Sequence, residues 1–239
     1  MIQEFLEGTE VSLHAICDGR TAKLFPTSQD HKRIFDGDKG PNTGGMGTYS
    51  PTPFLTEAEL KEVGQKILEP WLAGCEAEQI DFRGILYPGV MLTKEGPKVL
   101  EFNARFGDPE TQIYLTRLEN DLVEVLDASA RGKLGKTELR WGPTASVCVV
   151  MASGGYPGGY AKGRPIFGLE EAAKLPDVKV FHAGTAGKNG QIVTHGGRVL
   201  GVTAWAKDLQ EAQRAAYAAV GKIQFEGAQY RHDIAAKAL

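Results

Sequence analysis

The stretch Glu101–Gln112 (EFNARFGDPETQ) contains the residues whose types and spacing are best suited to chemistry. The three residues before it read as part of a β-strand, in which alternate side chains point to opposite faces. Glu101, Asn103 and Arg105 therefore share one face, and Phe102 belongs to a face that is expected to pack into a core. A carboxylate and an amide oxygen two residues apart suit Mg²⁺, and the guanidinium beside them suits an anion. A solvent-facing edge strand without any function would show the same alternation.

A turn and a helix are expected directly after this strand. Asp108 stands at the N-cap position, Pro109 at the first helical position and Glu110 in the first turn. Capping and the helix dipole would explain both carboxylates without any ligand. Because a helix N-terminus also attracts anions, a phosphate-binding role remains open at this point.

Antiparallel strands and covering helices are predicted to position these residues. A capping box begins the first helix, with Thr56 at the N-cap and Glu59 three residues later. Residues 82–93 and 98–105 form a predicted hairpin, and its second arm contains the stretch described above. Earlier strands are expected over residues 1–6, 10–18 and 21–26, and a further helix over residues 121–131.

The segment Thr27–Pro53 has little periodicity, many polar groups and several glycines. Long loops in compact domains are usually functional or disordered. Function is favoured here, because Asp30 and Lys32 are close in sequence and the glycines of residues 44–47 could bring backbone N–H groups to an anion. The spacing of a Walker A loop is absent, so an ordinary surface loop remains an alternative.

The connection Gly132–Pro143 is expected to separate two domains, residues 1–137 and residues 138–239. The second part reads as a small α+β unit with a helix that starts at Asp208. Its strands are predicted over residues 145–152, 178–183, 191–194 and 198–206. The predicted fold class of the whole chain is therefore α+β.

Composition restricts the possible functions of the 239-residue chain. Its 27 basic and 30 acidic residues give a net charge of −3, which argues against a nucleic-acid surface and does not suggest a membrane surface. The three cysteines form no Cys-x-x-Cys pair, so neither a disulfide framework nor a structural zinc is indicated. No apolar run approaches the ~20 residues that span a bilayer. A cytoplasmic protein is expected.

Seven stretches together resemble the phosphoribosylamine-glycine ligases, also called glycinamide ribonucleotide synthetases, of the ATP-grasp superfamily. Their common order and spacing are more specific than the Glu-x-Asn-x-Arg pattern alone, which biotin carboxylases also resemble. The matching stretches are residues 4–10, 27–33, 40–51, 101–112, 149–158, 181–185 and 194–203.

The resemblance implies a ligase that makes glycinamide ribonucleotide from 5-phosphoribosylamine, glycine and ATP through glycyl phosphate. It implies that Glu101 and Asn103 hold Mg²⁺ or Mn²⁺. ATP would be bound at its adenine by the backbone of Glu4, Phe5 and Leu6 and at its ribose by Glu10. The residues implied on the substrate side are Asp30, Lys32, Arg105 and Asp108.

The resemblance covers only the carboxyl-terminal part of this family: the second ATP-grasp lobe, with an antiparallel sheet and covering helices, and the small terminal domain. Half of a nucleotide clamp should bind ATP poorly. The chain alone is therefore expected to have little activity and to need a separate amino-terminal portion of the same enzyme.

Two other functions remain open on the sequence alone. A different ATP-grasp carboxylate–amine ligase would share Glu101 and Asn103 but should not need residues 30–33 and 107–112. An inactive remnant that binds a nucleotide or a partner is the other possibility, although the intact metal pair argues against decay.

Overall fold

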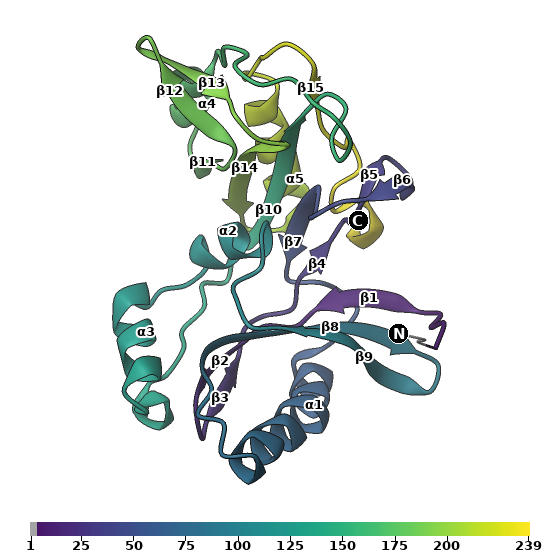
Figure 1. The fold of residues 1–239 in the computed structure, drawn as a ribbon, viewed down its shortest axis with the longest axis vertical. Helices are drawn as coiled ribbons and strands as arrows, with labels where there is room; N and C mark the ends of the chain where they lie inside the picture. Colours follow the sequence, from purple (N-terminus) through teal and green to yellow (C-terminus); the bar gives the residue numbers. More distant parts are fainter. Residues whose placement is uncertain (1–3) are drawn as a thin grey trace. The chain divides into compact units, whose positions relative to one another are not determined.

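A computed structural model describes residues 4–239, which form two compact units (Figure 1). Unit 1 contains the described residues up to Gln29 together with Pro51–Gly107 and Leu118–Gly142. Unit 2 contains Asp30–Ser50, Asp108–Arg117 and Pro143–Leu239. Two earlier segments, Asp30–Ser50 and Asp108–Arg117, thus fold with the carboxyl-terminal residues.

Unit 1 is built on an antiparallel sheet in which β8 (Arg83–Thr93) pairs with three other strands. Residues 83–86 of β8 pair with β2, residues 89–92 pair with β1, and the last seven residues pair with β9. The expected hairpin of β8 and β9 is thereby confirmed. The other strands of this sheet are β1 (Thr9–Ser12), β2 (Ala15–Asp18), β3 (Ala22–Leu24) and β9 (Gly96–Asn103).

The start of unit 1 differs from the prediction. Residues 1–3 lie outside the described residues, and Glu4–Leu6 are not in a strand. The continuous strand expected over residues 10–18 is two strands, β1 and β2, which pair with different parts of β8 and are separated by Leu13 and His14.

Helix α1 (Glu57–Ala77) covers this sheet and begins as its sequence predicts. The Thr56 hydroxyl accepts a hydrogen bond from the Glu59 N–H, and the Glu59 carboxylate accepts one from the Thr56 N–H, so the capping box is present. The apolar stripe of α1 packs against residues of β1 and β2 in one core. Helix α3 (Leu122–Ala130) lies within the predicted range 121–131 and is capped by Asp121, and the 3₁₀ turn η1 (Leu134–Lys136) follows it.

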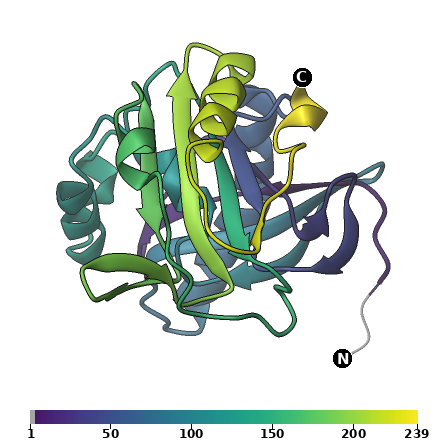
Figure 2. The same cartoon turned by 90° about the horizontal axis from the view of Figure 1, so that it is seen from above.

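Unit 2 is built on a second sheet with the order β11-β14-β10-β7-β4, in which β10 (Ala145–Ser153) is buried along its whole length. Helix α5 (Leu209–Val220) lies along β10 and β14 (Figure 2). On the face of β10 that carries Ser146, helix α2 (Glu110–Leu115) packs through a 2.8 Å hydrogen bond between the hydroxyls of Thr116 and Ser146. The other strands of this sheet are β4 (Gln29–Asp30), β7 (Gly47–Ser50), β11 (Val178–His182), β14 (Arg198–Ala206) and β15 (Ala228–Gln229), which pairs with β10.

Two small hairpins complete unit 2. The hairpin of β5 (Arg33–Phe35) and β6 (Lys39–Asn42) lies in the segment expected to be a loop, which also contains β4 and β7. The hairpin of β12 (Thr185–Lys188) and β13 (Gln191–Thr194) includes one strand, β12, that the sequence did not predict. The remaining helices are α4 (Leu169–Ala173) and the 3₁₀ turn η2 (Ala236–Ala238).

The β5–β6 hairpin is fastened to residues near the carboxyl terminus by an ionic network. Arg231 is fully buried, and its guanidinium donates two hydrogen bonds of 2.7 Å to the two carboxylate oxygens of Asp233. The same guanidinium donates to Asp38 Oδ1 at 3.0 Å and to the Arg33 carbonyl at 3.1 Å. Asp38 also pairs with Lys237. The hairpin is therefore held at its tip and at its first strand.

All three cysteines are buried and unpaired. Within residues 4–239, no helix is both long enough and apolar enough to cross a bilayer.

Candidate active site

Strand β9 ends at Asn103, two residues before the predicted end, but Glu101, Asn103 and Arg105 still lie in one hydrogen-bonded row in unit 1. Asn103 Nδ2 donates to Glu101 Oε1 at 2.9 Å, and Arg105 Nη2 donates to Asn103 Oδ1 at 3.2 Å. Arg105 Nη1 also donates to the Phe106 carbonyl at 2.9 Å, which fixes the guanidinium beside the end of the strand. The end of β9 and the bend that follows it thus bring a carboxylate, an amide and a guanidinium together.

Glu101 and Asn103 suit a hard divalent cation. Mg²⁺ binds one or two protein oxygens and completes its shell with water and phosphate oxygens. Among residues 4–239 there is no cluster of three or more His, Cys, Asp or Glu that could hold a metal ion. The Asn103 amide must turn over before its oxygen can join Glu101 at one ion, because that oxygen faces Arg105.

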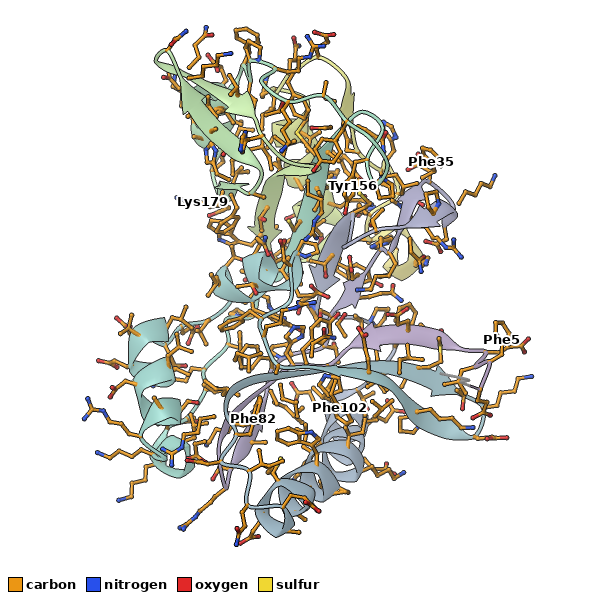
Figure 3. All side chains as sticks on the ribbon, viewed as in Figure 1. Phe5, Phe35, Phe82, Phe102, Tyr156 and Lys179 are labelled. Carbon is orange, nitrogen blue, oxygen red and sulfur yellow. The ribbon has the colours of Figure 1, made fainter. Side chains whose placement is uncertain are left out.

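The opposite face of β9 is only partly buried, so the core expected around Phe102 is incomplete. Phe102 is 48% exposed, and its ring centroid lies 6.3 Å from that of Trp71 in α1 (Figure 3). The Trp71 ring lies closer to the Phe82 ring, in an edge-to-face arrangement with 4.7 Å between the ring centroids. Among the described strands, β9 pairs with β8 alone.

The residues implied in nucleotide binding lie at the opposite end of β9 from this row. Glu4, Phe5 and Leu6 line an open cavity of about 390 Å³ together with residues of the β8–β9 turn. Glu4 pairs with Lys98 at 3.2 Å, and the Phe5 ring is exposed to solvent (Figure 3). Glu10 lies in β1, opposite Met91 of β8. The lysine of this cavity, Lys98, pairs with two carboxylates that also line it, those of Glu4 and Glu95.

In unit 2 the predicted residues Asp30 and Lys32 form an ion pair under a glycine. Lys32 Nζ lies 2.7 Å from Asp30 Oδ2, the Lys32 side chain is 33% exposed and the Asp30 side chain is 1% exposed. Gly45, with φ +114°, covers this pair, since a Cβ atom there would lie 2.7 Å from both carboxylate oxygens of Asp30. Lys32 is therefore the member of the pair that a substrate could reach.

The Asp30 carboxyl has a strongly perturbed pKa. Burial and the negative charge of nearby Glu110 raise its pKa well above the ordinary range, and Lys32 and the His31 N–H oppose this increase. Glu110 is itself buried. Asp30 therefore lies near a second buried carboxyl group, and Lys32 is the cation that opposes the rise of its pKa.

The helix-capping explanation of Asp108 is wrong. Helix α2 begins at Glu110, its N-cap residue is Pro109, and no side chain caps it. The Asp108 carboxylate instead accepts hydrogen bonds from Arg198 Nη2 at 3.0 Å and from Gln112 Nε2 at 3.0 Å. The Asp108 carboxylate, which the local sequence pattern predicts to cap the helix, therefore forms an ion pair with a residue distant in sequence.

Arg198 is the main residue of this region that sequence reasoning missed. It follows Gly196 and Gly197 at the start of β14, within the stretch 194–203 that carried part of the family resemblance. The family resemblance of that stretch was a signal that could have pointed to Arg198. The neighbouring sequence, however, does not show which residues its guanidinium contacts.

The first part of the chain identifies the class of protein. Residues 1–111 match the family described as "Phosphoribosylglycinamide synthetase, ATP-grasp (A) domain". The antiparallel sheet with its covering helices is thus part of an ATP-grasp fold, as the sequence predicted.

The second half of the chain gives the particular family. Residues 146–237 match "Phosphoribosylglycinamide synthetase, C domain", and the chain belongs to the phosphoribosylglycinamide synthetase family. The phosphoribosylamine–glycine ligase of Rhodopirellula baltica is 52% identical over 240 residues, which are 100% of this chain and 55% of that protein. The corresponding ligase of Vigna unguiculata is 51% identical over 95% of this chain and 74% of its own length.

A solved structure supports the same assignment. The crystal structure of phosphoribosylamine–glycine ligase from Thermotoga maritima has a TM-score of 0.85 and 39% sequence identity, covering 97% of this chain and 56% of that protein. The chain spans about half the length of most of the curated relatives it matches.

Proposed function

We propose that this chain is the carboxyl-terminal part of a ligase that joins glycine to 5-phosphoribosylamine. The glycine carboxylate would attack the γ-phosphorus of ATP and release ADP, and the amine would then attack the carbonyl of glycyl phosphate and release phosphate. The observation that carries the proposal is the match to both family domains by a chain whose Glu101, Asn103 and Arg105 still form one connected row.

We assign Mg²⁺, with Mn²⁺ as the alternative, to Glu101 and Asn103. A cation there would neutralise charge on the ATP phosphates, which is the main requirement of phosphoryl transfer. Arg105 supplies a second positive charge within hydrogen-bonding distance of Asn103. The cavity beside Glu4, Phe5 and Leu6 would take the adenine, and Glu10 would take the ribose hydroxyls.

On the substrate side we assign direct roles to Lys32 and Asp108, because both side chains reach solvent. One substrate carries a carboxylate and the other a phosphate, so an accessible lysine suits either. Asp30 is buried beneath Gly45 and would act by orienting Lys32. The loop of residues 44–47 would help to exclude water from the acyl phosphate.

Activity is proposed to need an amino-terminal portion of the same enzyme, since the relatives are about twice as long as this chain. The boundary between the ATP-grasp lobe and the small domain is proposed to follow Thr137, in the interval between the two family matches. A cytoplasmic location stays a prediction.

The test is to combine this chain with a separately produced amino-terminal portion and to measure ADP release. We expect release that depends on both glycine and 5-phosphoribosylamine, and little release from this chain alone. Full activity of the chain alone would contradict the need for a second portion, and ADP release with other amine acceptors but not with 5-phosphoribosylamine would contradict the substrate.

Glu101→Gln is the variant that tests the metal assignment. Loss of the carboxylate should lower kcat about a hundredfold or more, because metal neutralisation of phosphate charge contributes several kcal/mol to such steps. Glu62→Gln is the matched control, since Glu62 pairs only with Lys66 on the exposed surface of α1 among its described contacts. Equal rates for the two variants would remove Glu101 from the metal site.

A further inference from the structure

Gly44, the first glycine of the loop at residues 44–47, forms hydrogen bonds through both its N–H and its carbonyl with side chains from later in unit 2. Arg198 Nη1 donates to the Gly44 carbonyl at 2.6 Å and to the Gly45 carbonyl at 3.4 Å. The Gly44 N–H donates to the Tyr156 hydroxyl oxygen at 3.0 Å. Both main-chain polar groups of Gly44 are therefore satisfied by side chains more than a hundred residues away in sequence.

Two glycine-containing stretches form the support for these side chains. The Tyr156 ring, labelled in Figure 3, packs directly on Gly197, where a Cβ atom would lie 2.3 Å from the ring. The Ser153 N–H donates to the Gly197 carbonyl at 2.7 Å, and the Ser153 hydroxyl donates to the Gly196 carbonyl at 2.9 Å. Residues 153–156 and 196–198 are thus locked together, with Tyr156 and Arg198 directed at the same glycine.

The same guanidinium also fixes Asp108. Arg198 Nη1 donates to the Asp108 carbonyl at 2.6 Å, and Nη2 donates to the Asp108 carboxylate at 3.0 Å. One side chain therefore joins the glycine loop to the residue that we place beside the substrate. The hydrogen bonds to Gly44 and Asp108 are charge-assisted and come from a rigid planar group, which makes the arrangement geometrically specific.

We infer that Arg198 is a positioning residue, which with Tyr156 holds the loop of residues 44–47 and Asp108 in the arrangement used in catalysis. This inference rests on the proposed function. Gly197 has a packing role in this arrangement, because a side chain there would collide with the Tyr156 ring.

The first test needs no catalytic activity. In this chain, Arg198→Met should speed hydrogen exchange of the Gly44 and Gly45 amides, followed by NMR, by roughly tenfold or more, because charge-assisted hydrogen bonds contribute about 1.5–3 kcal/mol. Arg164→Met is the matched control, since Arg164 forms an exposed ion pair with Glu226. Unchanged exchange at both glycines in the Arg198 variant would overturn the inference.

A second pair of variants covers the case in which Arg198→Met fails to fold. Tyr156→Phe removes only the hydroxyl and should speed exchange at Gly44. Arg198→Lys keeps the charge but has fewer donors. Its exchange rate at Gly44 should therefore lie between the rate of the wild-type protein and that of the double variant with Tyr156→Phe and Arg198→Lys. Wild-type exchange in all of these variants would also overturn the inference.

The second test uses the chain combined with the amino-terminal portion. Arg198→Met should lower kcat by roughly tenfold or more and leave KM for ATP within about twofold, with partial recovery in Arg198→Lys. A loosened loop with undiminished ligase activity would overturn the positioning role alone. Loss of ligase activity in the wild-type assembly, with the exchange result intact, would instead count against the proposed function.

Discussion

Protonation of His31 is expected to weaken the fold as the pH falls. The side chain is 1% exposed, Nδ1 donates to the Gly47 carbonyl at 3.1 Å, and Nε2 has no hydrogen-bond partner among the described residues. Burial, together with the positive charges of Arg231 and Lys237, lowers the pKa of His31 to about 4. The imidazole is therefore neutral in the folded protein at pH values where an exposed histidine is already charged.

The size of the effect follows from the two pKa values. The unfolded chain takes up this proton near pH 6.5 and the folded chain only near pH 4, so protons favour the unfolded state between these values. From pH 7.5 to pH 4.5, His31 should lower the free energy of unfolding by about 2.5 kcal/mol. Asp30, whose pKa is raised, acts in the opposite direction over the same interval, so the comparison must be with a variant.

Urea unfolding at pH 7.5 and pH 4.5 measures this contribution. In His31→Gln, whose amide can still donate to the Gly47 carbonyl, the loss of stability between the two pH values should be about 2.5 kcal/mol smaller than in the wild-type protein. His182→Gln is the control, because His182 is exposed. Equal losses in the wild-type protein and His31→Gln would refute the assignment of a buried neutral imidazole.

Two further substitutions test the packing of unit 2 by urea unfolding. Gly45→Ala should lower the free energy of unfolding by about 1–3 kcal/mol, since the positive φ and the contact with Asp30 both oppose a Cβ atom, whereas Gly187→Ala faces open space and should be nearly neutral. Arg231→Met should lower it by about 3 kcal/mol, because the ion pairs of a fully buried guanidinium are lost, against less than about 1 kcal/mol for the exposed Arg164→Met. These expectations would be contradicted if Gly45→Ala lowered the free energy of unfolding no more than Gly187→Ala, or if Arg231→Met lowered it no more than Arg164→Met.

Local sequence signals predicted the parts of the molecule whose structure depends on near neighbours. Thr56 and Glu59 define the start of α1 by satisfying each other. Strand β14 has the predicted bounds, Arg198–Ala206. Alternation placed Glu101 and Asn103 on one face of β9, because a strand fixes the directions of its side chains.

Contacts between distant residues account for what the sequence did not show. The pattern around Asp108 fits a helix cap, but Arg198, ninety residues later, binds its carboxylate instead. Strand β7 (GTYS) has no apolar alternation, yet all four of its residues are buried, and the Arg117 guanidinium donates to the Ser50 hydroxyl. Buried polar residues that find distant partners leave no periodic signal in the sequence.

The pairing of β7 with β10 also affects how the protein can be made. Ser50 lies opposite Ser146 and Gly47 opposite Val149, so roughly a hundred residues must leave the ribosome before β7 gains this neighbour. If the chain were cut after Thr137, the carboxyl-terminal fragment would contain β10 but not β7. One edge of its central strand would then be open to pairing with other chains, and such a fragment should aggregate.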